Sequence, residues 1–151
     1  MIKVNVEINN KSWLKKIKNP QKYLNNKIKK IPSIIKFFKK KNVVFSILLT
    51  NSMNMKKLNK KFRRKNKATD VLSFPALEVK KLKLIKEKKI YIGDIAASFE
   101  IINLRSKKSN FSLEFDKVWV HGLLHLIGHD HIRNKDYFKM YKTEKRIVNL
   151  I

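Results

Sequence analysis

The segment that most restricts the fold of this chain runs from Ser112 to His131, because it is apolar on nearly every side and contains all four histidines. A helix without a polar face has to be buried in the protein. Buried imidazole rings that lack partners are costly, and a shared metal ion removes that cost. The fold must therefore enclose one helix and bring its histidines to a common point. The apolar positions are Val118, Trp119, Val120, Leu123, Leu124, Leu126 and Ile127.

Both ends of this helix carry sequence signals. Ser112 is expected to cap its start, with Glu114 and Asp116 near the positive end of the helix dipole. Gly128 is placed to end the helix in a left-handed conformation. The chain can then turn back, so that the residues after Gly128 lie beside the last helical turn.

The histidine spacing predicts a metal site. His121 and His125 are four residues apart, so they lie on one face of the helix and can point at one atom. His131, after the turn, can supply a third nitrogen. The chain has no cysteine, so any metal must be bound through nitrogen and oxygen. Three histidines and one open position are typical of catalytic zinc, and we expect one Zn²⁺ ion per chain.

Two residues just before His131 have open roles. His129 is a neighbour of the site, an alternative ligand or an exposed side chain, and we expect it not to be a ligand. Asp130 could orient a ligand histidine through a hydrogen bond. An aspartate in a tight turn is an equally ordinary explanation.

The spacing H-x-x-x-H-x-x-G-x-x-H matches the metzincin protease signature except at one position. Metzincins have a glutamate directly after the first histidine, where it acts as general base, and this chain has Gly122. Without that carboxylate, peptide hydrolysis loses its usual proton acceptor. A metal-dependent hydrolase of peptide or of another bond is therefore the alternative hypothesis.

The charge of the chain indicates a polyanionic partner. With 37 basic and 11 acidic residues, the formal net charge is +26, which favours binding to RNA, DNA or a ribosome. Only five of the basic residues are arginines and 32 are lysines, and asparagine is common, so an AT-rich genome accounts for part of the magnitude. The start of the chain lacks the apolar stretch of a signal peptide, and no apolar run is long enough for a membrane span. We expect a cytoplasmic protein without membrane contact.

The pattern of elements predicts a single α+β domain over residues 1–151, in which helices cover a small mixed sheet. Strands come mostly early in the chain and helices mostly late. Expected strands are 2–8, 43–50, 69–75 and 91–98. Expected helices are 20–40 (broken or divided at Pro32), 53–62 (capped by Asn51 or Ser52), 99–108, 113–127 and 134–149. Residues 79–89 form a lysine-rich connection.

Three stretches carry a resemblance to one known family. HGLLHLIGHDH at 121–131 closely resembles the YbeY signature H-G-x-L-H-L-x-G-Y-D-H. LNKKFRRKNKATDVLSFP at 58–75 is similar to that family's L-N-x-x-Y-R-x-K-D-x-P-T-D-V-L-S-F-P, and IGDI at 92–95 to its L-G-D-I. The order and spacing of the three agree. The resemblance covers the chain from about residue 43 onward.

The resemblance implies a metal-dependent endoribonuclease of the bacterial cytoplasm that is specific for single-stranded RNA. It also implies roles in maturing small-subunit ribosomal RNA, notably the 3′ end of 16S rRNA, and in ribosome quality control, with the small ribosomal subunit as partner. By position the metal ligands are His121, His125 and His131. The family's arginine falls on Arg63, which would bind a phosphate and stabilise charge in the transition state.

Several positions depart from the family pattern and bear mainly on substrate handling. Among the departures are Arg64, Asn66, Ala68 and His129, where the family usually has Gly, Asp, Pro and Tyr. A non-enzymatic ribosome-binding module with structural zinc is a further hypothesis, which would need His129 or Asp130 as fourth ligand.

The sequence leaves the chemistry partly open. Bound zinc could activate water, or polarise the phosphate while the ribose 2′-hydroxyl attacks, and no residue stands out as general base. Lysines and arginines from 60 to 67 would form a basic wall that leads RNA to the metal. Phe62 could stack on a base, but we expect it in the core. Thr69, Asp70 and Ser73 are expected to shape the backbone near the site, and Asp94 to be structural.

Overall fold

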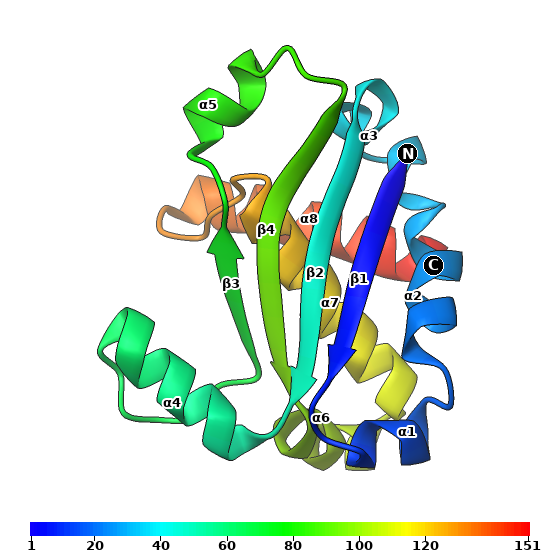
Figure 1. The fold of residues 1–151 in the computed structure, drawn as a ribbon, viewed down its shortest axis with the longest axis vertical. Helices are drawn as coiled ribbons and strands as arrows, with labels where there is room; N and C mark the ends of the chain where they lie inside the picture. Colours follow the sequence, from blue (N-terminus) through cyan, green and yellow to red (C-terminus); the bar gives the residue numbers. More distant parts are fainter.

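A four-stranded mixed sheet forms the centre of the protein, as expected (Figure 1). The computed structural model describes residues 1–151, apart from the side chain of Lys83. The strand order is β1-β2-β4-β3, in which β1, β2 and β4 are parallel and the edge strand β3 is antiparallel to β4. The strands are β1 (Ile2–Ile8), β2 (Asn42–Thr50), β3 (Val71–Pro75) and β4 (Lys89–Ser98).

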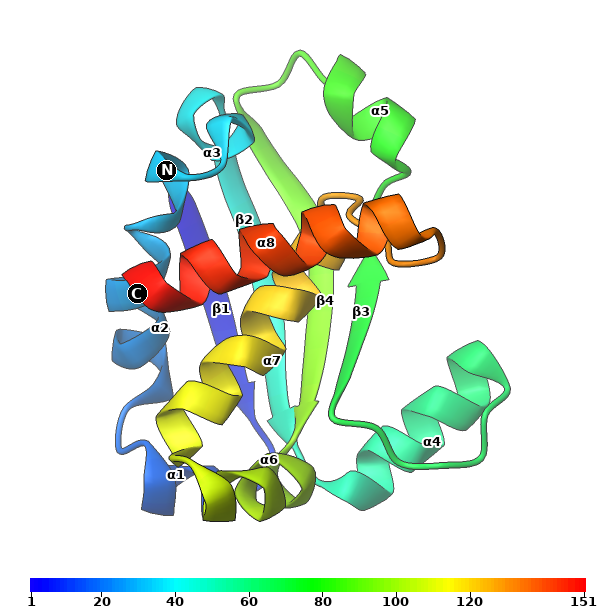
Figure 2. The same ribbon diagram turned by 180° about the vertical axis from the view of Figure 1, so that it is seen from behind.

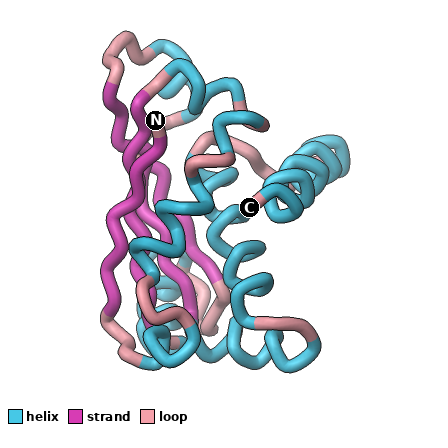
Figure 3. Tube along the Cα trace, turned by 90° about the vertical axis from the view of Figure 1, so that its right-hand side faces the viewer, coloured by secondary structure: helices cyan, strands magenta, loops and turns pink.

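Most of the helices lie on one side of the sheet, as Figures 2 and 3 show. The helices are α1 (Ser12–Lys16), α2 (Pro20–Ile28), α3 (Lys36–Lys40), α4 (Ser52–Arg63), α5 (Val79–Leu84), α6 (Phe99–Arg105), α7 (Phe111–Leu126) and α8 (Asn134–Leu150), with 3-10 turns at Ile31–Ser33 and Ser106–Lys108. Pro32 lies in the first of these turns and divides the helical region, as predicted. Helix α5 was not predicted, because lysines interrupt its apolar pattern around the buried Leu82. None of the described helices combines the length and the apolar character that a membrane span requires.

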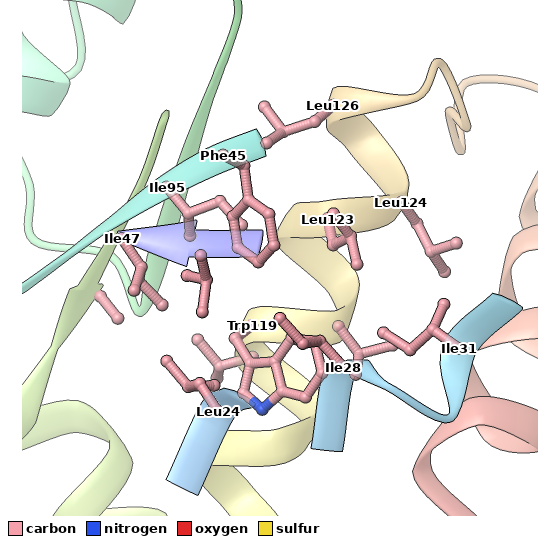
Figure 4. Packing of buried hydrophobic residues seen from close by; sticks show 14 of the residues in the cluster. Leu24, Ile28, Ile31, Phe45, Ile47, Ile95, Trp119, Leu123, Leu124 and Leu126 are labelled. Atoms are coloured by element: carbon pink, nitrogen blue, oxygen red, sulfur yellow. The ribbon is translucent and has the colours of Figure 1, made fainter. Parts of the chain in front are cut away.

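The predicted burial of α7 is confirmed: it packs along the covered face of the sheet, and most of its residues are buried. On β2, alternate residues from Val43 to Leu49 point into this core, while their neighbours are partly exposed. Figure 4 shows Trp119 and Leu123 of α7 in this layer, with Leu24 of α2 beside them. The main core thus lies between the sheet, α7 and the N-terminal helices.

Gly122 brings α7 close to the sheet. A Cβ atom at this position would lie 3.0 Å from Cγ2 of Ile95 and 3.1 Å from Oγ of Ser73. That serine hydroxyl donates a hydrogen bond of 3.1 Å to the Gly122 carbonyl oxygen. A larger side chain would push the helix away from the sheet, at a cost of about 1–3 kcal/mol even for small additions. A glutamate at this position would therefore require Ile95 and Ser73 to shift.

The start of α7 differs from the prediction. Asn110, not Ser112, is the N-cap, and its side-chain oxygen accepts a hydrogen bond of 2.8 Å from the Leu113 N–H. Both residue types cap helices well. The earlier start allows the ring of Phe111 to pack at 5.5 Å against the buried Trp13. Tertiary packing therefore selects between two locally suitable caps.

The predicted end of α7 is confirmed. Gly128 has φ +91°, and its N–H donates to the His125 carbonyl at 3.0 Å. The His129 N–H donates to the Leu124 carbonyl, also at 3.0 Å. This pair of bonds is a Schellman motif, which reverses the chain after the helix. Residues 129–131 are consequently directed back toward the last turn of α7.

Helix α4 packs on the other face of the sheet. Its Met55 forms a small second core with Leu72 of β3 and Ala96 of β4. Asn51 caps this helix, as one of the two predicted alternatives. At its end, Arg64 has a left-handed backbone with φ +57°.

We expect the Arg64→Gly variant to be more stable than the wild type by about 0.5–1 kcal/mol, because glycine adopts a positive φ without a Cβ clash. Urea denaturation measures this difference. Among the described non-glycine residues only Arg64 has a positive φ, so Lys65→Gly is a matched control that should gain no stability. Equal effects of the two variants would contradict the strain at Arg64.

Candidate metal centre

Three histidines converge at the C-terminal end of α7. His121 and His125 project from its last two turns, and His131 approaches from the loop that follows the Schellman motif. The Nε2 atoms of His121 and His125 are 3.0 Å apart, and one ligand atom from each of the three residues lies within 4.8 Å of the others. This grouping could hold a metal ion.

The donor set fits a tetrahedral ion. Zinc with Zn–N distances of about 2.0–2.1 Å needs ligand nitrogens roughly 3.3 Å apart, close to the separation of the two Nε2 atoms. His131 is exposed, so its side chain can turn toward this point. Among the described residues the grouping contains three potential ligands, which leaves a position for a non-protein ligand.

Hydrogen bonds to the other ring nitrogens orient both helical histidines. Nδ1 of His121 lies 3.0 Å from a carboxylate oxygen of Glu144 on α8. Nδ1 of His125 lies 2.9 Å from the backbone carbonyl of His129. A proton on each Nδ1 satisfies these acceptors and leaves the Nε2 lone pairs directed at the common point. These hydrogen bonds therefore preorganise His121 and His125 to bind a cation.

Glu144 was not identified from the sequence. A signal was nevertheless present, since Met140, Glu144 and Ile147 share one face of α8 and the other two are buried. A carboxylate on the apolar face of a helix needs a partner in the interior. The sequence does not show that this partner is His121, 23 positions earlier.

His129 and Asp130 take the less specialised of their possible roles. The ring of His129 lines a separate hollow with Val79 and Lys139, and it is not among the converging ligands. The Asp130 carboxylate accepts a hydrogen bond of 2.7 Å from the His131 N–H, as expected for a tight turn. The four-ligand site that a structural zinc would need is not formed by the described residues.

Burial and neighbouring charge lower the pKa of His125 from its ordinary 6.5 to about 4. Burial is the larger cause, followed by repulsion from His121 and His131. A neutral imidazole binds metals, whereas a protonated one does not. His125 therefore keeps a free lone pair at neutral and mildly acid pH.

Two hollows flank the site and both are lined by His121 and Glu144. One, of about 190 Å³, is also lined by His131, Met140, Tyr137 and Tyr141. The other, of about 240 Å³, extends past Arg105, Lys117 and Asp70. An extended ligand could thus reach His121 from either side.

Arg63 lies elsewhere on the molecule. It occupies the exposed last turn of α4, which packs on the sheet face opposite α7. No hydrogen bond or ion pair of its side chain is found within the described part of the chain. Its catalytic role stays a prediction.

The basic segment around Arg63 is ordered by a buried asparagine. Asn59 is 2 % exposed, and its amide donates a hydrogen bond of 2.9 Å to the Lys67 carbonyl. The side chains of Lys60, Lys61, Lys65 and Lys67 are exposed, as a basic wall requires. The expectation that Phe62 belongs to the core was wrong: its ring is 57 % exposed and touches Phe74 only by an edge-on contact.

The remaining polar residues of the second motif have structural contacts. Asp70 forms an ion pair with Arg105, and its carbonyl accepts a hydrogen bond of 2.9 Å from the Ser98 N–H. Ser73 contacts α7 at Gly122, so both shape the backbone beside the site. Asp94 accepts a hydrogen bond from Tyr91, in agreement with a structural role.

Comparison with known proteins decides the family. The family model described as Endoribonuclease YbeY matches residues 7–151. This chain belongs to the YbeY family. An Endoribonuclease YbeY of Pelagibacter ubique is 46 % identical over 156 residues, covering 100 % of this chain and 97 % of the relative. One of Thermodesulfovibrio yellowstonii is 31 % identical and covers 98 % of both chains.

A solved structure shares the YbeY-like fold. The solution structure of a Thermotoga maritima protein has 27 % sequence identity and a TM-score of 0.61, and covers 99 % of this chain and 87 % of that one. The sequence resemblance and the α+β fold expected for a YbeY protein are thereby confirmed.

Glu144→Ala should weaken zinc binding by about 10- to 100-fold, because His121 loses the carboxylate that fixes its ring and its tautomer. Competition with a chelating dye measures the affinity. Glu144→Gln, whose amide oxygen can still accept the Nδ1–H bond, should lose less. Glu7→Ala, on the exposed part of β1, is the control. Identical affinities for wild type and Glu144→Ala would refute this role.

The metal-free protein should lose stability as the pH falls. The folded chain holds the pKa of His125 near 4, below its ordinary 6.5, so the unfolded chain takes up this proton first. The free energy of unfolding should therefore decline from pH 6.5 toward pH 4 and gain nothing further from this residue at higher pH. Urea denaturation in a chelator should show a shallower decline for His125→Gln. Parallel curves for the two proteins would count against the lowered pKa.

Proposed function

We propose that this chain is a metal-dependent endoribonuclease that cuts single-stranded RNA. His121, His125 and His131 would bind one Zn²⁺ ion, and the substrate would be ribosomal RNA, with the 3′ end of 16S rRNA as the target. The observation that carries the proposal is the convergence of three imidazoles, two with their Nδ1 atoms already bonded, between two open hollows.

Charge and family support RNA as the substrate. The net charge of +26 favours a polyanion, and the relatives carry the name Endoribonuclease YbeY. The proposal extends to action in the cytoplasm, on the small ribosomal subunit and in ribosome quality control. These assignments follow from the family resemblance, and the net charge of +26 is consistent with an RNA-rich partner.

The residues of the site have distinct tasks in this proposal. Zinc, when bound, supplies Lewis acidity at the phosphodiester and makes water a stronger acid. His121 and His125 present Nε2 because Glu144 and the His129 carbonyl occupy their Nδ1 atoms. The lowered pKa of His125 keeps this ligand deprotonated at neutral pH.

Arg63 would bind a substrate phosphate through its planar guanidinium and, with its long side chain extended past β3 toward the histidines, would stabilise charge in the transition state. Its exposure and its lack of an ion-pair partner among the described residues leave it available for a ligand. Because α4 and α7 lie on opposite faces, an RNA that touches both Arg63 and the histidines would cross the edge strand β3.

The alternative hypotheses lose support from specific contacts. A metzincin-type protease needs a carboxylate at position 122, where this chain has a glycine packed closely against Ile95 and Ser73. A structural zinc usually has four protein ligands, whereas three potential ligands converge within the described part of the chain. Hydrolysis of RNA therefore agrees best with the site.

His125→Ala should lose zinc and ribonuclease activity together, because it removes a ligand. Arg63→Ala should retain zinc but cut RNA about 10²- to 10³-fold more slowly, as for loss of one group that stabilises transition-state charge. Metal analysis and cleavage of a labelled single-stranded RNA measure both properties.

The controls separate the hypotheses. Lys60→Ala removes a neighbouring exposed charge of α4 and should remain close to wild type, and casein should stay intact in every reaction. RNA cleavage that is unchanged in both His125→Ala and Arg63→Ala would overturn the proposed mechanism.

A further inference from the structure

Helix α8 exposes three large aromatic side chains within five positions. Tyr137, Phe138 and Tyr141 are 51 %, 61 % and 50 % exposed. The core contacts of this helix are made instead by Met140 and Ile147, which are buried. The three rings are therefore not needed to hold α8 in place, and clustered exposed aromatic groups often mark binding sites.

The two tyrosines are prearranged. Four residues apart, they lie on the same side of the helix. Their rings are almost parallel, with an angle of 9° and centroids 6.2 Å apart. Phe138 supports Tyr137 from the side at 5.7 Å, edge-on at 75°. Contacting rings lose less side-chain freedom than isolated ones when a flat ligand stacks on them.

The tyrosine pair lines a hollow beside the metal centre. Tyr137 and Tyr141 line the hollow of about 190 Å³ that is also lined by His121, His131 and Glu144. A base that stacks on these rings would therefore be adjacent in the strand to a phosphate at the histidines. The other hollow beside His121 is lined by Arg105 and Lys117, which are paired with Asp70 and Glu114.

The charge of the exposed side of α8 favours a nucleic acid over an apolar partner. The exposed basic residues of α8 are Lys135, Lys139, Lys142, Lys145 and Arg146. Aromatic rings set among lysines and arginines are the usual surface for unpaired bases, because the rings stack on bases while the cations bind the backbone.

We propose that Tyr137 and Tyr141 form a stacking platform for an unpaired base of the RNA strand whose phosphate is held at the histidine centre. This inference rests on the proposed function and deepens it. In a duplex both faces of a base are already stacked, so the platform selects single-stranded RNA. The strand would run from the tyrosines to His121.

The test measures RNA binding rather than cleavage. With a chelator present, so that no RNA is cut, the Tyr137→Ala/Tyr141→Ala double variant should bind a fluorescein-labelled single-stranded RNA about 5- to 100-fold more weakly than wild type, as expected for loss of base stacking. Tyr137→Phe/Tyr141→Phe keeps the rings and should bind like wild type. The affinity for a duplex of the same sequence should not change.

The matched control is Tyr91→Ala. Tyr91 is 42 % exposed on β4, with its hydroxyl bonded to Asp94 and Ser46, outside both hollows. Its loss should leave RNA binding unchanged. Circular dichroism confirms that each variant is folded, and both α8 tyrosines are exposed enough for the alanine variants to fold.

The outcomes distinguish this inference from the proposed function. If the alanine double variant binds single-stranded RNA like wild type while zinc-loaded wild type cuts it, the stacking inference is refuted and the proposed ribonuclease activity is retained. If zinc-loaded wild type cuts no RNA but the double variant still binds more weakly, the platform stands and the nuclease is wrong. Equal weakening by the phenylalanine double variant would also overturn stacking.

Discussion

The close packing of α7 on the sheet at Gly122 is the contact on which the rest of this structure depends. Without a side chain there, the helix lies against Ile95 and Ser73. Successive helical residues are rotated by about 100°, so a glycine that faces the sheet turns His121 and His125 to the flank of the helix. That flank faces α8. The depth and rotation of one buried helix thus decide where the histidines can meet a ligand.

Helix α8 and the loop before it supply the remaining groups of the metal centre that α7 begins to form. The Schellman motif at Gly128 returns the chain, which brings His131 to the site and the His129 carbonyl to His125. Glu144 then fixes the ring of His121. The same helix carries the tyrosine pair one to two turns earlier. One short reversal of the chain therefore unites the ligands, the groups that orient them and the surface proposed to bind the substrate.

The edge strand β3 lies between the basic segment around Arg63 and the metal centre. Its Leu72 faces α4 and the exposed segment around Arg63, whereas its Ser73 faces α7 and the metal centre. Adjacent residues of a strand point to opposite faces, so this short strand connects both regions through consecutive side chains. An RNA strand crossing this edge would meet cations on both sides of the sheet, which gives the high positive charge a local function.

The sequence by itself determined the features that follow from local periodicity. The four strands, the buried helix, its end at Gly128 and the shared face of His121 and His125 all follow from spacings of two, three or four residues and from the backbone needs of glycine. Only the tertiary structure decided that Asn110 rather than Ser112 caps α7, since packing of Phe111 on Trp13 made the choice. It also decided that Glu144 bonds to His121, that the tyrosines open into the same hollow, and that α4 packs opposite α7. These contacts join residues far apart in the chain, and no local pattern encodes which distant side chain will fill a given space.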